Sequence, residues 1–554
     1  MNNKTAFLIA FALFLCTRAF AQEWSFIYEY DRASDPVVRN TCKEAYEMSD
    51  GRVLVSGISI IRNDCGILLG NNTGYHPSIV ALDSDGTVLH QATYLRDGYI
   101  GGDPYVLEND SGETFILYQY NPDHDTCSAN YFMNFSPPTD HSTLVLSRLN
   151  DDLSIAESFE WDIPIDTFLL DTTIHVMPGQ ISLFTAFVDS DGYIVGGYSK
   201  TVSNDVEPRG MDSTFFFKMD FGGNMVKLVG YETTHSGYWA DTYYRYYHIV
   251  EADSLYLYYG WSGEVVDQQD RNLVYFDKDF NVVRTGRFRH SEQLPGLPTY
   301  YRDLFYEMNV IRSATGTTYM SCCADVQDIQ LNKNYHICLL YEFDDGAAYY
   351  STVPIKRYIE RKTKRWDNVP LRKGVDVTSD NSIYFAYTLN VGVAENLDSW
   401  IMIEHLTPSF DNIETVYYDL PGEEMFCNAS GITATEDGGA LLTLKGKDLN
   451  QTNRRFEAVV KFPQEAFVDI EEAHDNGLKV AVAYPNPGGN TLNICTGLPN
   501  ARVEVYDALG RLMHRQDITE NETSINTETW PSGVYVWKVY SNGKEAESGK
   551  WEKE

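Results

Sequence analysis

Three short segments of the chain combine aromatic, arginine and aspartate side chains. Flat rings stack on the apolar faces of sugars, and Arg and Asp form hydrogen bonds with hydroxyl groups, so this combination is typical of a glycan-binding surface. In an alternative interpretation the rings pack into the protein and the charges only solvate its surface. The candidate ligand-binding residues are Trp239, Asp241, Tyr243, Tyr244 and Arg245, then Tyr300, Tyr301, Arg302 and Asp303, and finally Arg365, Trp366 and Asp367.

The sequence contains no hydrolase, kinase or metalloprotease motif. The nearest approach to a nucleophile elbow is Gly260-Trp-Ser-Gly263, in which the second glycine comes one residue early. No H-E-x-x-H pair and no phosphate-binding loop occur. A pair of glycosidase carboxylates contributed by distant segments would leave no local motif. Catalytic residues therefore remain unknown, and an enzyme remains the alternative to a binding protein.

Acidic segments could suggest a metal site, but their spacing fits none. Asp123, His124, Asp125 and Cys127 lie in one long loop with no known ligand order, which favours a polar surface loop. The two Asp-Ser-Asp-Gly sequences, at 83–86 and 189–192, have no terminal glutamate of an EF-hand loop and are typical of turns. We expect no metal and no cofactor.

The candidate binding segments lie between repeated pairs of β-hairpins. The stretch Ser78–His90 is an outer hairpin with an apolar strand on each side of Asp85-Gly86, and 47–57 is an inner one. The sequence contains seven such units, of about 60 residues each. Their inner turns are Asp50-Gly51, Ser111-Gly112, Asp191-Gly192, Asp253-Ser254, Thr315-Gly316, Asp380-Asn381 and Asp437-Gly438.

Four strands in each unit predict a seven-bladed β-propeller over residues 22–465. In this fold the connections from one blade to the next all emerge on one face, which would bring the three binding segments together around the channel mouth. The seventh unit has no fourth strand of its own, and we expect residues 24–30 to replace it and close the ring. An extended N-terminal arm is the alternative.

Composition and the N-terminal sequence indicate an exported protein. The 554 residues carry a formal charge of −36, which disfavours nucleic acid as a partner. Residues 1–21 have a cationic start, an apolar run and the small-residue exit Ala19-Phe20-Ala21, which predicts a cleaved signal peptide. No later apolar run has the length of a membrane span. A linker is predicted at 466–477.

Residues 478–554 contain three motifs in order: Tyr484-Pro-Asn-Pro487, Val503-Glu-Val-Tyr-Asp-Ala-Leu-Gly-Arg511 and Gly533-Val-Tyr-Val-Trp-Lys-Val539. This segment resembles the C-terminal sorting domain of type IX (Por) secretion substrates of Bacteroidota. The resemblance implies a small β-sandwich, recognition by the type IX secretion machinery and passage through the periplasm to the outer-membrane surface or the medium. It also implies removal of the tail, with release of the protein or its attachment to surface lipopolysaccharide.

Cys323 and Cys338 flank the connection between two strands symmetrically, so a regular hairpin places them opposite one another and permits a disulfide. Cys322 would then point to the other face, and free thiols remain the alternative. The predicted fold is therefore all-β, a propeller followed by a sandwich. We expect it to bind a glycan or a surface protein; the alternatives are a glycosidase or lyase with its site on the propeller face, and a purely structural protein.

Overall fold

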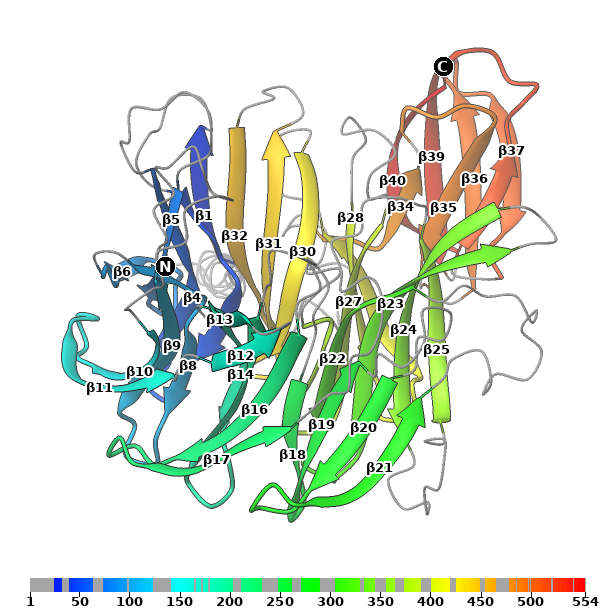
Figure 1. Cartoon of the computed structure of the whole chain (residues 1–554). Helices are drawn as coiled ribbons and strands as arrows, with labels where there is room; N and C mark the ends of the chain where they lie inside the picture. The colour runs from blue at the N-terminus through cyan, green and yellow to red at the C-terminus, as the bar shows by residue number, and fades with distance from the viewer. Residues whose placement is uncertain are drawn as a thin grey trace, which may run out of the picture.

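The protein is an all-β chain whose strands form a series of small antiparallel sheets (Figure 1). The three candidate binding segments, the expected signal peptide and the expected linker lie outside the described part of the chain. The computed structural model describes residues 24–31, 39–62, 73–96, 99–122, 141–163, 166–170, 173–177, 180–202, 211–231, 248–261, 271–288, 304–328, 333–343, 355–363, 373–389, 400–418, 425–448, 454–464, 478–484, 486–496, 498, 500–519, 522–541 and 543–553.

In the described part of the chain, the strands before residue 465 form seven sheets of four or five strands, one of which gains an edge strand from residues 478–479, and we number these sheets in chain order. Sheet 1 contains β2 (Arg39–Asn40), β3 (Glu44–Glu47), β4 (Val53–Arg62), β5 (Thr73–Leu82) and β6 (Val88–Thr93). Sheet 2 contains β7 (Tyr99–Gly101), β8 (Tyr105–Glu108), β9 (Thr114–Pro122), β10 (Ser142–Leu149) and β11 (Ile155–Ile163). A separate hairpin follows, made of β12 (Asp166–Leu170) and β13 (Thr173–Met177). Sheet 3 contains β14 (Gln180–Val188), β15 (Ile194–Val202), β16 (Met211–Met219) and β17 (Met225–Tyr231).

The remaining four sheets follow the same order. Sheet 4 contains β18 (His248–Ala252), β19 (Leu255–Trp261), β20 (Arg271–Phe276) and β21 (Val282–Phe288). Sheet 5 contains β22 (Leu304–Arg312), β23 (Thr318–Asp328), β24 (Lys333–Phe343) and β25 (Ile355–Thr363). Sheet 6 contains β26 (Val375–Val377), β27 (Ile383–Leu389), β28 (Trp400–Leu406), β29 (Asn412–Tyr418) and, at its edge, β33 (Leu478–Lys479). Sheet 7 contains β30 (Met425–Ala434), β31 (Ala440–Asp448), β32 (Arg454–Phe462) and β1 (Trp24–Asp31).

The N-terminal strand completes the last sheet, as the sequence predicts. Strand β1 pairs antiparallel with β32 from Trp24 opposite Lys461 to Asp31 opposite Arg454. Strand β32 would otherwise present an unpaired edge. Sheets 1 and 2 have five strands instead of the four expected. In sheet 1 the short strands β2 and β3 both pair with β4, and in sheet 2 the short strands β7 and β8 both pair with β9. Sheet 6 also has a fifth strand, because β33 pairs with β29.

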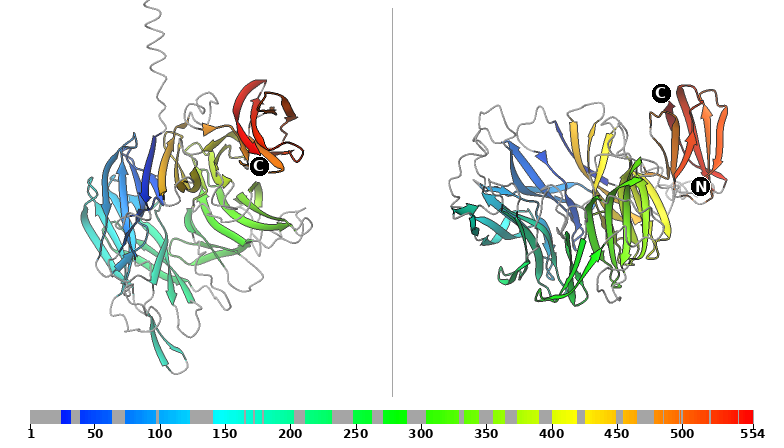
Figure 2. Two further views of the ribbon diagram at one scale, coloured as in Figure 1. Left: turned by 90° about the horizontal axis from the view of Figure 1, so that it is seen from above. Right: turned by 45° about the vertical axis from the view of Figure 1, so that its right-hand side comes forward.

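The innermost strands of successive sheets contact one another around a common centre. The contacts are β4 with β8, β8 with β14, β14 with β18, β18 with β22, β22 with β26, β26 with β30, and β30 with β3. The last contact brings sheet 7 beside sheet 1, and Figure 2 shows the sheets arranged side by side around this centre. The architecture is therefore propeller-like.

Each inner hairpin turn contains one residue in the left-handed backbone region. These residues are Gly51, Gly112, Gly192, Asp253, Gly316, Asn381 and Gly438, with φ between 56° and 84°. In the first turn, the Gly51 amide donates to the Met48 carbonyl oxygen at 2.9 Å. The positive φ explains why Gly, Asn or Asp occurs at these positions.

The inner turns also connect neighbouring sheets. The amide of Ser49 donates to Glu108 of sheet 2 at 3.1 Å, and the amide of Ser190 donates to Glu251 of sheet 4 at 2.8 Å. The amide of Glu436 in sheet 7 donates to Glu47 of sheet 1 at 2.6 Å. These charge-assisted bonds join adjacent sheets, and the third of them joins the last sheet to the first.

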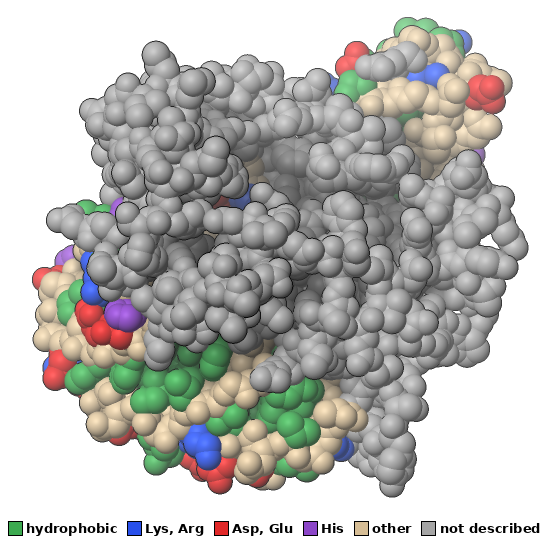
Figure 3. All heavy atoms as spheres, viewed as in Figure 1, with side chains coloured by type: hydrophobic (Ala, Val, Ile, Leu, Met, Phe, Trp, Pro, Cys, Tyr) green, Lys and Arg blue, Asp and Glu red, His purple; other side chains and the backbone are tan. Residues whose placement is uncertain are grey.

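The middle strands are buried on both faces. Leu144, Leu146, Phe216 and Phe217 are fully covered, which explains why such segments read as continuous apolar runs. The outer strands keep apolar side chains at the surface, among them Val226 and Leu228 of β17. Figure 3 shows hydrophobic side chains gathered in the lower part of this view, where β16 and β17 lie.

Two further sheets form the C-terminal part of the chain. One contains β34 (Ala481–Tyr484), β35 (Thr491–Thr496) and β38 (Glu522–Asn526). The other contains β37 (Leu512–Asp517), β36 (Ala501–Asp507), β39 (Gly533–Ser541) and β40 (Lys544–Lys553). Val503, Trp537 and Trp551 are buried between them. Across the described residues, no helix has the length and apolarity needed to cross a membrane.

His405 of β28 is buried in sheet 6. Its Nε2 lies 2.9 Å from the Ser382 hydroxyl oxygen, and its ring stacks on Tyr384 with 4.7 Å between centroids. Burial lowers the pKa of His405 below its ordinary value of 6.5, although the charge of Asp380 partly opposes this. The folded protein therefore holds this imidazole neutral at pH values where the unfolded chain binds a proton.

We expect the stability of the protein to fall as the pH drops below about 6.5, by up to about 1.4 kcal/mol per pH unit for this group. His405→Gln should remove that part of the loss, because the glutamine cannot take up a proton. The measurement is the unfolding midpoint at pH 7.0 and pH 5.5. His90→Gln, at an exposed histidine, is the control. An equal drop in the wild type and in His405→Gln would contradict the assignment.

Candidate functional site

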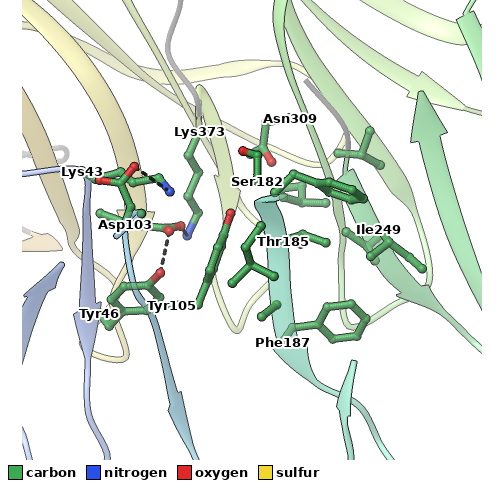
Figure 4. A pocket seen from close by; sticks show the side chains of 18 of the residues that line it. Lys43, Tyr46, Asp103, Tyr105, Ser182, Thr185, Phe187, Ile249, Asn309 and Lys373 are labelled. Carbon is green, nitrogen blue, oxygen red and sulfur yellow. Dashed lines mark hydrogen bonds and ion pairs between the residues drawn. The ribbon is translucent and has the colours of Figure 1, made fainter. Parts of the chain in front are cut away.

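A cavity of about 600 Å³ lies at the centre of the sheets. Most of its lining residues come from β3, β8, β14, β18, β22 and β26, the innermost strands of six sheets, or lie next to them in the sequence; Ile58 of β4 and Gln119 of β9 are added from the neighbouring strands. Because six of the seven sheets contribute, the cavity collects side chains that are far apart in the chain. Figure 4 shows Lys43, Asp103 and Lys373 on one side of this space; on the other side Phe187 and Ile249 lie with the uncharged polar residues Ser182, Thr185 and Asn309.

The first charged pair of the cavity joins sheets 1 and 2. Lys43 Nζ lies 3.2 Å from Asp103 Oδ2, and both side chains are largely buried. The same ammonium group lies 4.8 Å from the centroid of the Tyr105 ring, within the range of a cation–π contact. A donor, an acceptor and an aromatic face therefore stand together at this side of the cavity.

The second charged group joins sheets 6, 7 and 1. Lys373 Nζ lies 3.1 Å from Asp376 Oδ2 and 4.0 Å from Glu44 Oε1, and it donates to the Thr433 hydroxyl at 3.2 Å. Tyr46 completes the group, since its hydroxyl donates to Glu44 at 2.6 Å. The two charged groups lie on the same side of Tyr105 in Figure 4.

The protonation of the second group suits binding better than proton transfer. Burial alone lowers the pKa of Lys373, but the carboxylates of Asp376 and Glu44 outweigh it, so the pKa is raised above its ordinary value. Burial, together with the charge and hydrogen bond of Glu44, raises the pKa of Tyr46 well above its ordinary value. Lys373 is therefore an ammonium ion and Tyr46 a neutral phenol near pH 7. Neither group is prepared to act as a general base.

The opposite wall is mostly apolar. Strand β14 contributes Phe184 and Phe187, and β18 contributes Ile249 and Val250. One polar side chain of the wall is fixed, because the Asn309 amide donates to the Val375 carbonyl oxygen at 2.9 Å. Glu251 of β18 and Arg312 of β22 also line the cavity, so this wall contains charged residues beside its apolar majority.

The candidate residues predicted from sequence fall in the segments 232–247, 289–303 and 364–372, outside the described residues. Each segment leads directly into a strand or residue of the cavity wall: β18, β22, and Lys373 just before β26. Sequence reasoning missed Lys43, Asp103 and Lys373 themselves. Their sequence neighbours carry no motif, and only the predicted ring of first strands could have indicated where they meet.

The predicted hairpin register of the cysteines is confirmed. Cys323 of β23 lies directly opposite Cys338 of β24, and Cys322 lies opposite Leu339. Cys338 and Cys322 are both buried but belong to different apolar clusters, as expected for residues on opposite faces of the sheet. Among the described residues, no group of three His, Cys, Asp or Glu side chains is arranged to hold a metal ion.

A disulfide between Cys323 and Cys338 remains a prediction. Opposed positions on adjacent strands bring two cysteines within bonding distance, and export to an oxidising compartment would allow the bond to form. Peptide mapping of the secreted protein without reductant should recover the two residues in one cross-linked peptide. Recovery of both as free thiols would exclude the bond.

The charge network of the cavity makes a testable contribution to stability. Replacing Lys373 with Met would leave Asp376 and Glu44 without its ammonium group in a partly buried site, and we expect a loss of about 1–3 kcal/mol. Lys373→Arg keeps the charge and should recover most of this loss. Denaturant unfolding of both variants measures the difference. Equal stability of Lys373→Met and the wild type would show that the network is energetically neutral.

The three C-terminal motifs occupy defined places in the last two sheets. Tyr484 ends β34, the second motif forms β36 and its turn, and the third forms most of β39. In that turn Asp507 accepts the amide of Arg511 at 2.9 Å and binds its guanidinium group at 2.6 Å. A family model described as a secretion system C-terminal sorting domain matches residues 482–551.

These residues are a C-terminal sorting domain. A sorting domain of this family implies recognition by the type IX secretion system and export to the cell surface or the extracellular space. The match covers this domain and does not extend into the seven sheets. No curated protein matches the chain.

Solved structures with a similar course of the chain have low identity and low TM-scores. A Dyadobacter fermentans protein of unknown function is 8% identical, with 79% of this chain and 99% of that chain covered and a TM-score of 0.35. An ulvan lyase, a polysaccharide lyase, is 12% identical, with coverages of 77% and 95% and a TM-score of 0.41. PorZ, a surface component of the type IX secretion system of Porphyromonas gingivalis, is 8% identical, with coverages of 95% and 100% and a TM-score of 0.21.

Proposed function

We propose that the seven sheets are the blades of a closed seven-bladed β-propeller over residues 22–465. A linker at 466–477 joins it to the sorting domain at 478–554, and residues 1–21 are the signal peptide. The cycle of contacts between innermost strands and the pairing of β1 with β32 support closure. The sorting domain supports delivery of this propeller to the bacterial surface or the medium.

We infer that the exported propeller binds a glycan in its central cavity. The observation that supports this most directly is the cavity of about 600 Å³, a volume in the range of small-ligand sites, with ion pairs and tyrosines on one wall and apolar residues on the other. Sugars present hydroxyl groups and apolar ring faces together, and such a cavity matches both. A protein ligand at the same face is the alternative partner.

The three aromatic segments extend this proposal beyond the cavity itself. Each of them immediately precedes a part of the chain that lines the cavity, so a longer glycan held inside would meet these segments next. Their Trp, Tyr, Arg and Asp residues are suited to the same ligand chemistry.

Binding fits the cavity better than glycan cleavage. A glycosidase needs a carboxyl group that stays protonated near neutral pH. In this cavity Asp103 and Asp376 each lie within 3.2 Å of a lysine ammonium group, so both carboxyl groups are engaged in ion pairs. We therefore propose a binding protein, with a glycosidase or lyase as the alternative.

The proposal predicts that the mature protein is retained on immobilised polysaccharide or glycoprotein and is eluted by the soluble glycan. Tyr105→Ala should weaken retention about tenfold or more by removing a stacking surface, and Trp239→Ala with Tyr301→Ala should abolish it. Tyr358→Ala, at an outer strand, is the matched control and should be retained normally. Absence of retention for the wild type, or release of shorter glycans during incubation, would overturn the binding function.

A further inference from the structure

We propose that the cavity takes the end of an uncharged oligosaccharide and discriminates against acidic sugars. This proposal rests on the glycan-binding function proposed above and specifies the ligand class for the same site. It follows from how the charges of the cavity are paired and from how a hydroxyl group differs from a carboxylate as a hydrogen-bonding partner.

The charges that line the cavity compensate one another. Three cationic and four anionic side chains line it, so its formal charge is −1. The cations Lys43, Lys373 and Arg312 each lie within 4 Å of a carboxylate. An acidic sugar would have to compete with these carboxylates for the ammonium groups, and it would approach a chain whose formal charge is −36.

The same ion pairs suit hydroxyl groups. Lys43 offers only donors and Asp103 only acceptors, and their polar atoms are 3.2 Å apart. A sugar hydroxyl both donates and accepts, so one hydroxyl can accept from Lys43 while it donates to Asp103. The pair of Lys373 and Asp376, 3.1 Å apart, repeats this arrangement on the same side of the cavity. Neither ion pair has to be broken for the ligand to bind.

The remaining walls of the cavity can contact the apolar faces of a sugar ring. Tyr105 lies between the charged residues and Thr185 in Figure 4, where its ring divides the cavity. Across from it stand Phe187 and Ile249, which cannot form hydrogen bonds with hydroxyl groups through their side chains. A pyranose with equatorial hydroxyls toward the ion pairs would place its C–H surfaces against these rings and chains. An uncharged sugar therefore satisfies both sides of the cavity.

The first test compares neutral and acidic trisaccharides on the mature full-length protein. The probes are maltotriose, cellotriose and mannotriose, against trigalacturonate, with binding measured by calorimetry at low ionic strength. We expect at least one neutral trisaccharide to bind about tenfold or more tightly than trigalacturonate, a difference of about 1.4 kcal/mol. Equal or tighter binding of trigalacturonate would overturn this inference while leaving the glycan-binding function in place. Binding of none of the four would overturn both.

A single substitution should change this preference in a defined direction. Asp103→Asn keeps the size of the side chain but removes the carboxylate that Lys43 contacts, so the ammonium group becomes available to an acidic sugar. We expect the affinity ratio of neutral to acidic trisaccharide to fall about tenfold.

Asp85→Asn is the matched control, because it makes the same change of charge at an exposed turn of sheet 1. Its ratio should equal that of the wild type. An unchanged ratio in Asp103→Asn, or an equal shift in Asp85→Asn, would show that the charge pairing of the cavity does not determine the preference. Thermal unfolding of each variant confirms that the comparison is made on folded protein, and the wild-type ratio tests the inference without any variant.

Discussion

The structure depends on the pairing of its first strand with its last sheet. Strand β32 would leave a row of unpaired amide and carbonyl groups at the edge of sheet 7, and β1 satisfies them over eight residues. The hydrogen bond from the Glu436 amide to the Glu47 carboxylate then joins sheet 7 to sheet 1. Sheet 7 is therefore built from strands at both ends of this part of the chain, and its strand β30 contacts β26 of sheet 6 and β3 of sheet 1.

The charged wall of the cavity forms where sheets 6, 7 and 1 lie side by side. Lys373, which precedes sheet 6, reaches Glu44 of sheet 1 and Thr433 of sheet 7, so one ammonium group has partners in three parts of the chain. Burying a charge is costly unless it is paired, and these partners are in reach only while the sheets stand side by side. The charged wall therefore depends on contacts between neighbouring sheets and not on any single segment of the chain.

The parts of the structure that follow from short-range chemistry could be predicted from sequence. All seven inner turns lie where Gly, Asn or Asp allows a left-handed residue, and the register of Cys323 with Cys338 follows from a symmetric hairpin. The sorting domain was recognisable from three ordered motifs. Strand β33 and the hairpin β12–β13 were missed, because a two-residue edge strand and an isolated pair carry no repeat pattern. The cavity was missed because Lys43, Asp103 and Lys373 meet only after the ring assembles.

The position of β1 also sets the order of events during biosynthesis. Strand β1 leaves the ribosome before every other described strand, yet its partner β32 is made after every described strand of the seven sheets except the two-residue strand β33. The pairing of β1 with β32 therefore cannot form while the chain between them is still being made, and contacts of such long sequence separation form slowly. The sorting domain begins shortly after β32, so it is synthesised only after strands β1 to β32. A chain that ends before β32 would lack both the strand that pairs with β1 and the domain that the type IX secretion system recognises.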